Sequence, residues 1–136
     1  NMIVKCNNHE LMAMAGSRED PEDPEILGRI ARELGTRNNA AFVVTRGSKG
    51  MMVLDRNSLH CVDGVKVSGP IDIVGAGDSA SAGFVLGLTR GLTPSQAAMV
   101  GCCVSSITIQ QIGTTGTATV PQVLKRLEAY LQGKTV

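Results

Sequence analysis

The residues best suited to chemistry form one short segment, Asp72-Ile73-Val74-Gly75-Ala76-Gly77-Asp78-Ser79. A Gly-Ala-Gly turn before a helix leaves the backbone N–H groups of the first helical turn open to an anion, because no side chain blocks the approach. The helix dipole adds positive potential there and favours the ionised carboxylate of Asp78. The segment therefore predicts a phosphate-binding loop in which Asp78 accepts a proton from an attacking hydroxyl.

The same glycines also fit the dinucleotide-binding pattern Gly-x-Gly-x-x-Gly/Ala, over Gly75 to Ala80. That pattern requires an acidic residue about 20 positions further on to hold the ribose hydroxyls. After Asp78, however, the next acidic residue is Glu128. A Walker A loop is excluded because no Gly-Lys-Ser/Thr follows the glycines. A dinucleotide-binding oxidoreductase therefore remains the less favoured alternative.

Two further segments precede this loop in the chain. Asn7-Asn8-His9-Glu10 places an Asn at the end of a short apolar run with a Glu three residues later, which is also the pattern of an ordinary helix capping box. Thr45 to Gly50 reads Thr-Arg-Gly-Ser-Lys-Gly, a glycine-bounded turn between two apolar runs that is also typical of a hairpin. Each segment has a purely structural interpretation when it is taken alone.

Taken in this order, the three segments resemble the ribokinase (pfkB) family of carbohydrate kinases. Asp72 to Ser79 matches the family signature of an Asp, two Thr, Ser, Val or Ile positions, Gly-Ala-Gly-Asp and a small hydroxyl residue. Ala80 stands where the family usually has Phe, and Gly83-Phe84 supplies a Gly-Phe pair one turn later. The resemblance implies that Asp78 is the catalytic base at the substrate hydroxyl. It also implies that Gly75, Ala76 and Gly77 form the anion hole for the transferred phosphate.

The resemblance further implies ATP and Mg²⁺ as cofactors. The family's Asn-x-x-Glu motif corresponds to Asn7 and Glu10, so Glu10 is expected to act on Mg²⁺ through water and Asn7 to lie near the nucleotide phosphates. ATP is expected to lie along the glycine-bounded turn, with Gly101 at the adenine position that is often Asn or His. The residues implied in ATP binding are Asn7, Glu10, Thr45, Arg46, Gly47, Ser48, Lys49, Gly50, Gly77 and Gly101.

Several family members hold a monovalent cation such as K⁺ with backbone carbonyls, and the candidates here are Asp72, Val74 and Gly113. The match covers residues 1–136 as the C-terminal part of a ribokinase-like kinase domain, with the N-terminal half and the lid absent. The expected partners are the remainder of that domain and a small sugar or nucleoside acceptor, and homodimerisation stays open. A non-catalytic nucleotide-binding or assembly module is the second alternative.

The length, charge and composition of the chain exclude several other classes of function. The 136 residues suit one core, and a net charge of +1 gives no large field to attract nucleic acid or an anionic membrane surface. No apolar stretch reaches the roughly 18 residues of a membrane span. The four cysteines lack Cys-x-x-Cys spacing and are interpreted as buried thiols in a reducing compartment, which predicts a cytoplasmic location.

Strands alternate with helices along the chain, which predicts an α/β fold. With the resemblance, the expected architecture is a three-layer, doubly wound, mainly parallel sheet of the ribokinase-like type. Val123, Leu124, Leu127 and Leu131 are expected on the inner face of the last helix, which begins at Pro121. Strands are predicted over residues 2–6, 41–45, 51–54, 59–62 and 65–67, and helices over 9–14, 26–34, 78–88 and 94–111.

Overall fold

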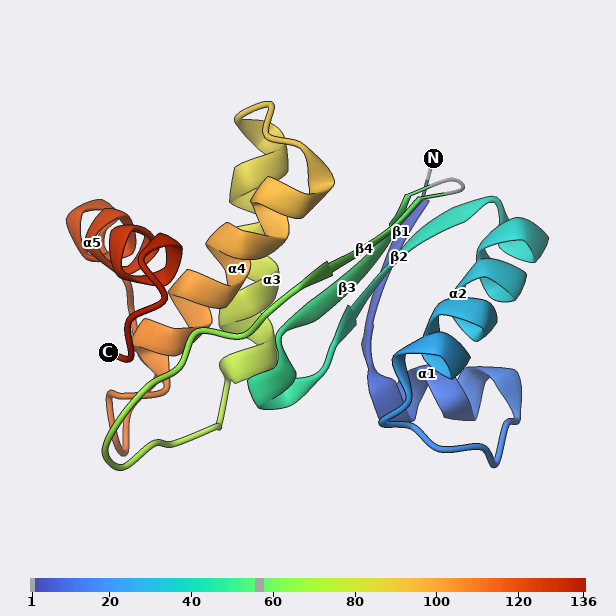
Figure 1. Cartoon of the computed structure of the whole chain (residues 1–136), viewed down its shortest axis with the longest axis horizontal. Helices are drawn as coiled ribbons and strands as arrows, with labels where there is room; N and C mark the ends of the chain where they lie inside the picture. The colour runs from blue at the N-terminus through green and yellow to red at the C-terminus, as the bar shows by residue number, and fades with distance from the viewer. Residues whose placement is uncertain (1, 56–57) are drawn as a thin grey trace. The chain divides into compact units, whose positions relative to one another are not determined.

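The computed structural model describes residues 2–55 and 58–136. The chain divides into two compact units, Asn1–Val62 and Asp63–Val136. Each unit is described by itself, and Figure 1 labels the elements of both.

The first unit is built on a mixed sheet with the strand order β1-β2-β3-β4. The parallel pairing β1–β2 places Ile3 opposite Ala41, and the β2–β3 and β3–β4 pairings are antiparallel. The sheet is therefore mixed rather than mainly parallel, and a connection as short as the one from β2 to β3 permits only antiparallel neighbours. The elements are β1 (Met2–Asn7), α1 (Asn8–Ala15), α2 (Pro24–Asn38), β2 (Ala40–Thr45), the 3₁₀ turn η1 (Gly47–Lys49), β3 (Met51–Asp55) and β4 (Ser58–Val62).

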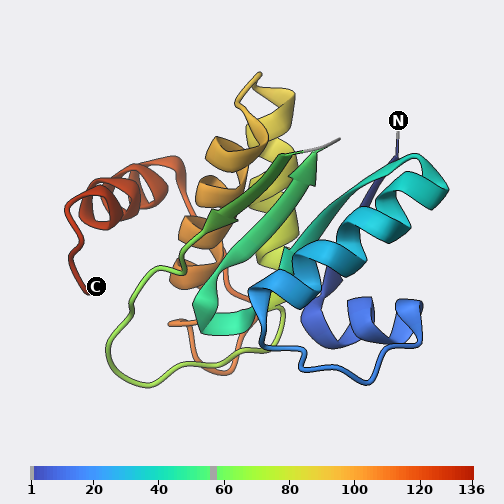
Figure 2. The ribbon, with the colours of Figure 1, turned by 45° about the vertical axis from the view of Figure 1, so that its right-hand side comes forward.

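Both helices of this unit pack on one face of the sheet, as Figures 1 and 2 show. Alternate residues of a strand point to the same face, so Phe42 and Val44 of β2 meet Met52 and Leu54 of β3 beneath the helices. This arrangement buries the apolar stripe of α2 and fixes the strand ends at which the Asn7 and Thr45 segments begin. The core cluster comprises Cys6, Leu11, Met12, Leu27, Ile30, Ala31, Phe42, Val44, Met52 and Leu54.

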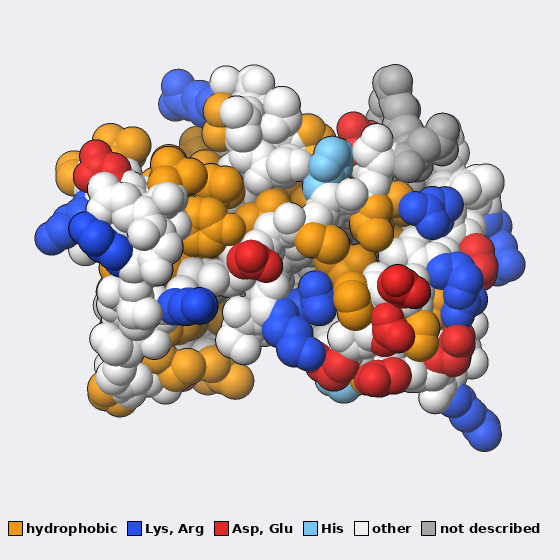
Figure 3. All heavy atoms as spheres, viewed as in Figure 1, with side chains coloured by type: hydrophobic (Ala, Val, Ile, Leu, Met, Phe, Trp, Pro, Cys, Tyr) orange, Lys and Arg blue, Asp and Glu red, His pale blue; other side chains and the backbone are white. Residues whose placement is uncertain are grey.

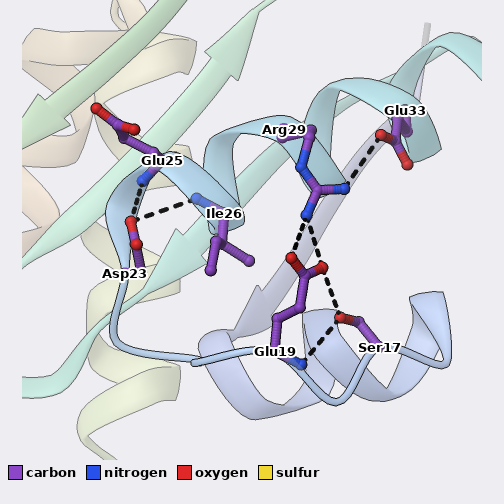
Figure 4. Close-up of polar contacts among 7 residues, drawn as sticks. All are labelled: Ser17, Glu19, Asp23, Glu25, Ile26, Arg29 and Glu33. Carbon is purple, nitrogen blue, oxygen red and sulfur yellow. Dashed lines mark hydrogen bonds and ion pairs between the residues drawn. The ribbon is translucent and has the colours of Figure 1, made fainter.

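Polar contacts fix the start of α2 and join it to the preceding loop (Figure 4). Asp23 caps the helix by accepting a hydrogen bond from Glu25 N at 2.8 Å. Arg29 pairs with Glu19 of the loop at 2.6 Å and with Glu33 one turn on at 3.4 Å. Charged side chains of both signs accordingly gather on the visible surface of this unit (Figure 3). These contacts hold the loop of residues 16–23, called the acidic loop below, against the helix.

The sequence predicted that this helix ends at residue 34, before Gly35, and this is wrong. The helix continues to Asn38 and ends where Asn39 takes the left-handed conformation with φ of +49°. Gly35 is needed inside the helix because a Cβ there would lie 2.8 Å from the Ala40 carbonyl oxygen. The glycine therefore permits a close approach of helix and strand.

The second unit contains three helices within the described residues: α3 (Ala76–Thr89), α4 (Pro94–Thr108) and α5 (Val120–Leu131). Residues 63–75 run to α3 without strand or helix, as Figure 2 shows, so the edge strand predicted at 65–67 is wrong. The backbone of this segment pairs with the end of the chain instead. Ser68 N donates to Val136 O at 2.7 Å, and Val136 N donates to Lys66 O at 2.9 Å.

Helices α3 and α4 cross at glycines. A Cβ at Gly83 would lie 2.9 Å from the Cα of Gly101, and a Cβ at Gly87 would lie 2.8 Å from the Cα of Ala97. Bare backbone at these positions lets the second half of α3 approach α4 closely. Helix α4 ends at Thr108, three residues before the predicted end at 111.

Helix α5 packs on α4 through a polar contact. Arg126 donates from Nη1 to Ser106 O at 3.2 Å and from Nη2 to Gln110 Oε1 at 2.8 Å. Of the four residues predicted on the inner face, Val123 and Leu127 are half-buried, whereas Leu124 and Leu131 are 56% and 68% exposed. Apolar side chains also reach the surface elsewhere in this view of the unit (Figure 3). Among the described residues, none of the helices combines the length and the apolar character that crossing a bilayer requires.

Candidate functional site

The predicted phosphate loop lies at the N-terminus of α3. Gly75 is the N-cap residue in the left-handed conformation, with φ of +76°. A side chain there would be strained, so glycine is required by the backbone itself. The first helical hydrogen bond runs from Ser79 N to Gly75 O at 2.9 Å. The turn and the helix start predicted from the sequence are therefore confirmed as local structure.

The backbone N–H groups at this helix start differ in their availability. Ala76 N donates to Ile73 O at 3.1 Å, which closes the turn before the helix. Among the described residues, Gly77 N and Asp78 N have no hydrogen-bond acceptor, as is usual for the first turn of a helix. The sequence prediction placed the Ala76 amide in the anion hole, whereas in the structure this amide already donates to Ile73 O. The sequence prediction missed the amide of Asp78, which has no hydrogen-bond acceptor among the described residues.

Asp78 lies in the first turn of α3 with an exposed side chain. Within the described part of the chain, its carboxylate makes no hydrogen bond, so both oxygens can accept a proton or a donor group. The helix is anchored on its other side by Ala80 and Phe84, which are 4% and 5% exposed. This orientation presents the carboxylate and the two free amides at one end of the helix.

Asp72 connects the phosphate loop to the loop that follows α4. Its Oδ1 accepts a hydrogen bond from Val74 N at 3.1 Å, and its Oδ2 accepts one from Gly113 N at 3.2 Å. Its own N–H donates to Ile109 O at 2.7 Å. The structure thus brings together all three candidates for the monovalent cation. The contact is made by the carboxylate of Asp72 rather than through the backbone carbonyls on which the prediction rested.

The loop after α4 is closed by a residue that the sequence reasoning missed. Gln111 donates from Nε2 to Thr117 O at 2.6 Å and accepts from Thr117 N at 3.1 Å. Gly116 lies so close to Thr108 that a Cβ would come within 2.6 Å of the Thr108 carbonyl oxygen. These contacts order the loop that presents Gly113 to Asp72. Glutamine carries no signal for this role in the sequence alone.

Gly101 was predicted to contact ATP near adenine. The structure places it in the middle of α4, buried where that helix crosses α3. Its Cα lies 2.9 Å from the position that a Cβ of Gly83 would occupy. The small residue at this position is thus explained by the close approach of the two helices.

The other predicted ATP residues lie in the first unit. Asn7 caps α1 by accepting a hydrogen bond from Glu10 N at 2.8 Å, while Glu10 Oε2 accepts one from Asn7 N at 2.8 Å. The capping box that the sequence permits is therefore formed. It occupies one carboxylate oxygen of Glu10 and leaves Oε1 free. A carboxylate oxygen on an exposed side chain fits a water-mediated contact with Mg²⁺, which prefers oxygen ligands.

The turn from Thr45 to Gly50 is tightly folded. Arg46 N donates to Gly50 O at 2.8 Å, and Gly50 N donates to Gly47 O at 3.1 Å. Gly47 and Gly50 have φ values of +56° and +87°, so both positions require glycine. Arg46 Nε is buried and has no hydrogen-bond partner within residues 2–55 and 58–136. The sequence predicted the turn correctly, and the structure adds that its backbone depends on both glycines.

Lys49 of this turn is joined to the acidic loop. Its Nζ lies 2.6 Å from Glu22 Oε2, and Asn8 donates to Glu22 Oε1 at 2.7 Å. The hydrogen bond from Lys49 is the main cause that lowers the pKa of the Glu22 carboxyl below its ordinary value. Glu22 therefore ties the predicted nucleotide turn to the start of α1. The sequence showed Glu22 only as one of several acids in a loop.

The remaining candidate groups are the side chains that could bind a metal and the cysteine thiols. Within the described residues there is no cluster of three or more His, Cys, Asp or Glu side chains that could hold a metal ion. Cys6, Cys102 and Cys103 are buried as predicted, and burial raises the pKa of their thiols to about 11, 12 and 11. Cys61 was also predicted to be buried, but it lies exposed on β4, whose pairing covers its backbone and not this side chain.

Comparison with known proteins identifies the class. The profile of the pfkB family of carbohydrate kinases matches residues 2–121. A ribokinase of Lactococcus lactis is 32% identical over 115 residues, covering 81% of this chain and 38% of that protein. A nucleoside kinase of Methanocaldococcus jannaschii is 31% identical over 91 residues, covering 66% of this chain and 30% of that protein. The chain belongs to the pfkB family of carbohydrate kinases.

Solved structures agree on the fold. Arabidopsis thaliana ribokinase complexed with ribose and ATP has a TM-score of 0.84 at 21% identity, over 93% of this chain and 41% of that one. Phosphofructokinase-2 of Escherichia coli has a TM-score of 0.81 at 23% identity, over 96% and 41%. The ribokinase-like α/β fold expected from the sequence is therefore confirmed. The chain spans between 26% and 40% of the lengths of the first four sequence relatives it matches.

Proposed function

We propose that this chain carries the phosphoryl-transfer part of an ATP-dependent kinase that phosphorylates an alcohol hydroxyl of a sugar or nucleoside. The observation that carries the proposal is the start of α3, where the exposed Asp78 carboxylate stands beside the unpaired Gly77 and Asp78 amides. A base must reach the hydroxyl while hydrogen-bond donors meet the charge on the transferred group. This helix end supplies both. ATP also occurs in the complex with the Arabidopsis ribokinase.

In this mechanism Asp78 takes the proton of the attacking hydroxyl as its oxygen approaches the γ-phosphorus. The bond from the γ-phosphorus to the β,γ-bridging oxygen breaks as the new bond forms, and ADP leaves. The free amides of Gly77 and Asp78, with the turn at Gly75, stabilise the charge on the phosphoryl oxygens. Because the donors are part of the backbone, they are oriented before the reaction begins. Ala76 contributes its carbonyl and its place in the helix to this arrangement. Its N–H does not contribute, because it donates to Ile73 O.

The first unit serves the nucleotide in this proposal. Asn7 and the turn from Thr45 to Gly50 would contact ATP, and the second carboxylate oxygen of Glu10 would bind Mg²⁺ through water. When bound, Mg²⁺ would neutralise phosphate charge. Asp72, with Val74 and Gly113, is the proposed location of a monovalent cation such as K⁺. The acceptor and the remainder of the kinase domain are the expected partners, in a cytoplasmic enzyme.

Two observations argue against the alternative functions. A dinucleotide-binding loop follows a strand, but residues 68–75 form no strand in this structure. A non-catalytic nucleotide-binding module would account for Gly101 at the adenine position that is often Asn or His, but the close helix crossing explains that glycine without reference to catalysis.

The deciding experiment replaces the base in the full-length polypeptide that the gene encodes. Asp78→Asn keeps the side-chain size but removes the proton acceptor, so turnover should fall by roughly 10² or more while ATP binding persists. Asp63→Asn is the matched control, because Asp63 is an exposed aspartate of the same unit outside the site. ADP release is measured with a panel of sugars and nucleosides, and ATP affinity by calorimetry.

Two results would refute the proposal. Turnover of the Asp78→Asn protein near the wild-type level would remove Asp78 as the base. ATP binding by the wild-type protein without ADP release on any acceptor of the panel would favour the non-catalytic module.

A further inference from the structure

Two serine hydroxyls contact the first turn of α3 at successive carbonyls. Ser105 of α4 donates from Oγ to Ala76 O at 3.1 Å, and Ser81 of α3 donates from Oγ to Gly77 O at 2.7 Å. Neither serine belongs to a motif that the sequence singled out. Ser105 is 29 residues from its partner in the chain and approaches from a different helix.

The position of these carbonyls matters because a peptide group is planar. The Ala76 carbonyl and the Gly77 N–H are the two ends of one peptide plane, so a bond that fixes the carbonyl also fixes the direction of that N–H. In the first turn of a helix, the N–H of a peptide group has no acceptor within the helix. The peptide plane is therefore fixed only by the hydrogen bonds of its carbonyl. Ser105 supplies an additional hold on the plane whose free N–H faces the proposed phosphoryl site.

We propose that Ser105 is a positioning residue that orients the Gly77 amide toward the transferred phosphoryl group. Ser81 acts in the same way on the next plane, which carries the Asp78 amide, but it does so from within the same helix. Only Ser105 ties the amide to a second element. The proposal rests on the proposed kinase function, because it assigns a task to a residue of that same site.

The packing of the helices does not depend on this hydroxyl. The α3–α4 crossing is set further along by the contacts of Gly83 with Gly101 and of Gly87 with Ala97. Ile109, four residues after Ser105, accepts the N–H of Asp72 at 2.7 Å. The last part of α4 therefore holds the phosphate loop at two places, before and after the turn. Loss of the Ser105 hydroxyl should loosen one peptide plane and leave the helix pair assembled.

The test is Ser105→Ala in the full-length polypeptide. We expect kcat to fall by roughly threefold to tenfold, the factor that corresponds to one hydrogen bond, with KM for ATP unchanged. Affinity for the complex of MgADP, acceptor and aluminium fluoride, which imitates the transferring phosphoryl group, should fall by a similar factor, whereas MgADP affinity should not. Ser105→Thr keeps a hydroxyl and should restore both values.

Ser106→Ala is the matched control. Ser106 is the neighbouring serine of α4, but its hydroxyl donates to Cys103 O at 2.7 Å within the same helix, and it accepts from Arg126. Its removal should lower stability at least as much without changing kcat. The inference is overturned if Ser105→Ala turns over at the wild-type rate, or if both alanine variants lose kcat equally. A normal Ser105→Ala with an inactive Asp78→Asn refutes this inference alone, and an active Asp78→Asn refutes the proposed function.

Discussion

The crossing of α3 and α4 can be tested with a substitution for which helix propensity and packing predict opposite changes in stability. Replacing Gly83 by Ala in the interior of a helix normally stabilises it by about 1 kcal/mol, because Ala restricts the unfolded chain and Gly does not. At Gly83, however, the new Cβ would lie 2.9 Å from Gly101 Cα, 2.9 Å from Val104 Cγ2 and 3.1 Å from Val100 O. Ordinary van der Waals contacts begin at 3.4 Å.

The magnitude follows from which atoms must move. Val104 Cγ2 belongs to a side chain, but the Gly101 and Val100 atoms are backbone, so relief requires α4 to move by several tenths of an ångström. Overpacking of this kind costs about 1–3 kcal/mol. After the gain from propensity is subtracted, Gly83→Ala should destabilise the protein by about 1 kcal/mol.

Urea unfolding of the full-length polypeptide, followed by circular dichroism, measures this change from the shift in midpoint at constant slope. Val85→Ala is the control, because Val85 lies on the same helix with 55% of its surface exposed. It gains propensity without touching the crossing, so its stability should rise by up to about 0.5 kcal/mol. A Gly83→Ala protein that is more stable than the wild type would refute the close crossing and, with it, the explanation given for Gly101.

Two further predictions concern the cysteines and the acidic loop. Mass-spectrometric mapping of iodoacetamide labelling in the native protein should find Cys61 modified first and Cys6, Cys102 and Cys103 only after denaturant is added, since burial raises the pKa of the latter three thiols. Equal labelling of all four would contradict the burial. Glu22 has a lowered pKa through Lys49, so its contribution to folding is present above the ordinary glutamate pKa and is lost as pH falls through the folded value. Thermal unfolding should therefore show Glu22→Gln less stable than the wild type at neutral pH and equal to it in acid, and a difference that persists unchanged in acid would refute the pairing.

The features that the sequence predicted well are local ones. Gly75 must be glycine because φ is positive there, and Asn7 with Glu10 three residues later forms the capping box that the spacing indicates. Strands β2 and β3 follow from short apolar runs on either side of the turn from Arg46 to Gly50. In each of these cases the residues that interact are close together in the chain, so the order of the amino acids contains the information.

The failures arise where an interaction reaches across the chain. Gly35 suggested a helix end, but its role is to let the Ala40 carbonyl approach. Residues 65–67 suggested a strand, but their backbone neighbour is the C-terminal Val136. A pattern shows that such a residue is small or apolar and does not show what it contacts.

The same distinction divides the candidate site itself. Its proposed reactive groups lie within one turn of α3, and the tetrapeptide from Gly75 to Asp78 predicted the Asp78 carboxylate and the Gly77 amide but not the Asp78 amide. The frame that aims them comes from Ser105, 29 residues away, and from Gly113, 41 residues from Asp72. Orientation errors of about 1 Å can cost 10²-fold in rate, so catalytic competence depends on that frame as much as on the motif. A chain that kept Gly-Ala-Gly-Asp but lost these distant contacts would still match the motif, and we expect it to bind ATP better than it transfers the phosphoryl group.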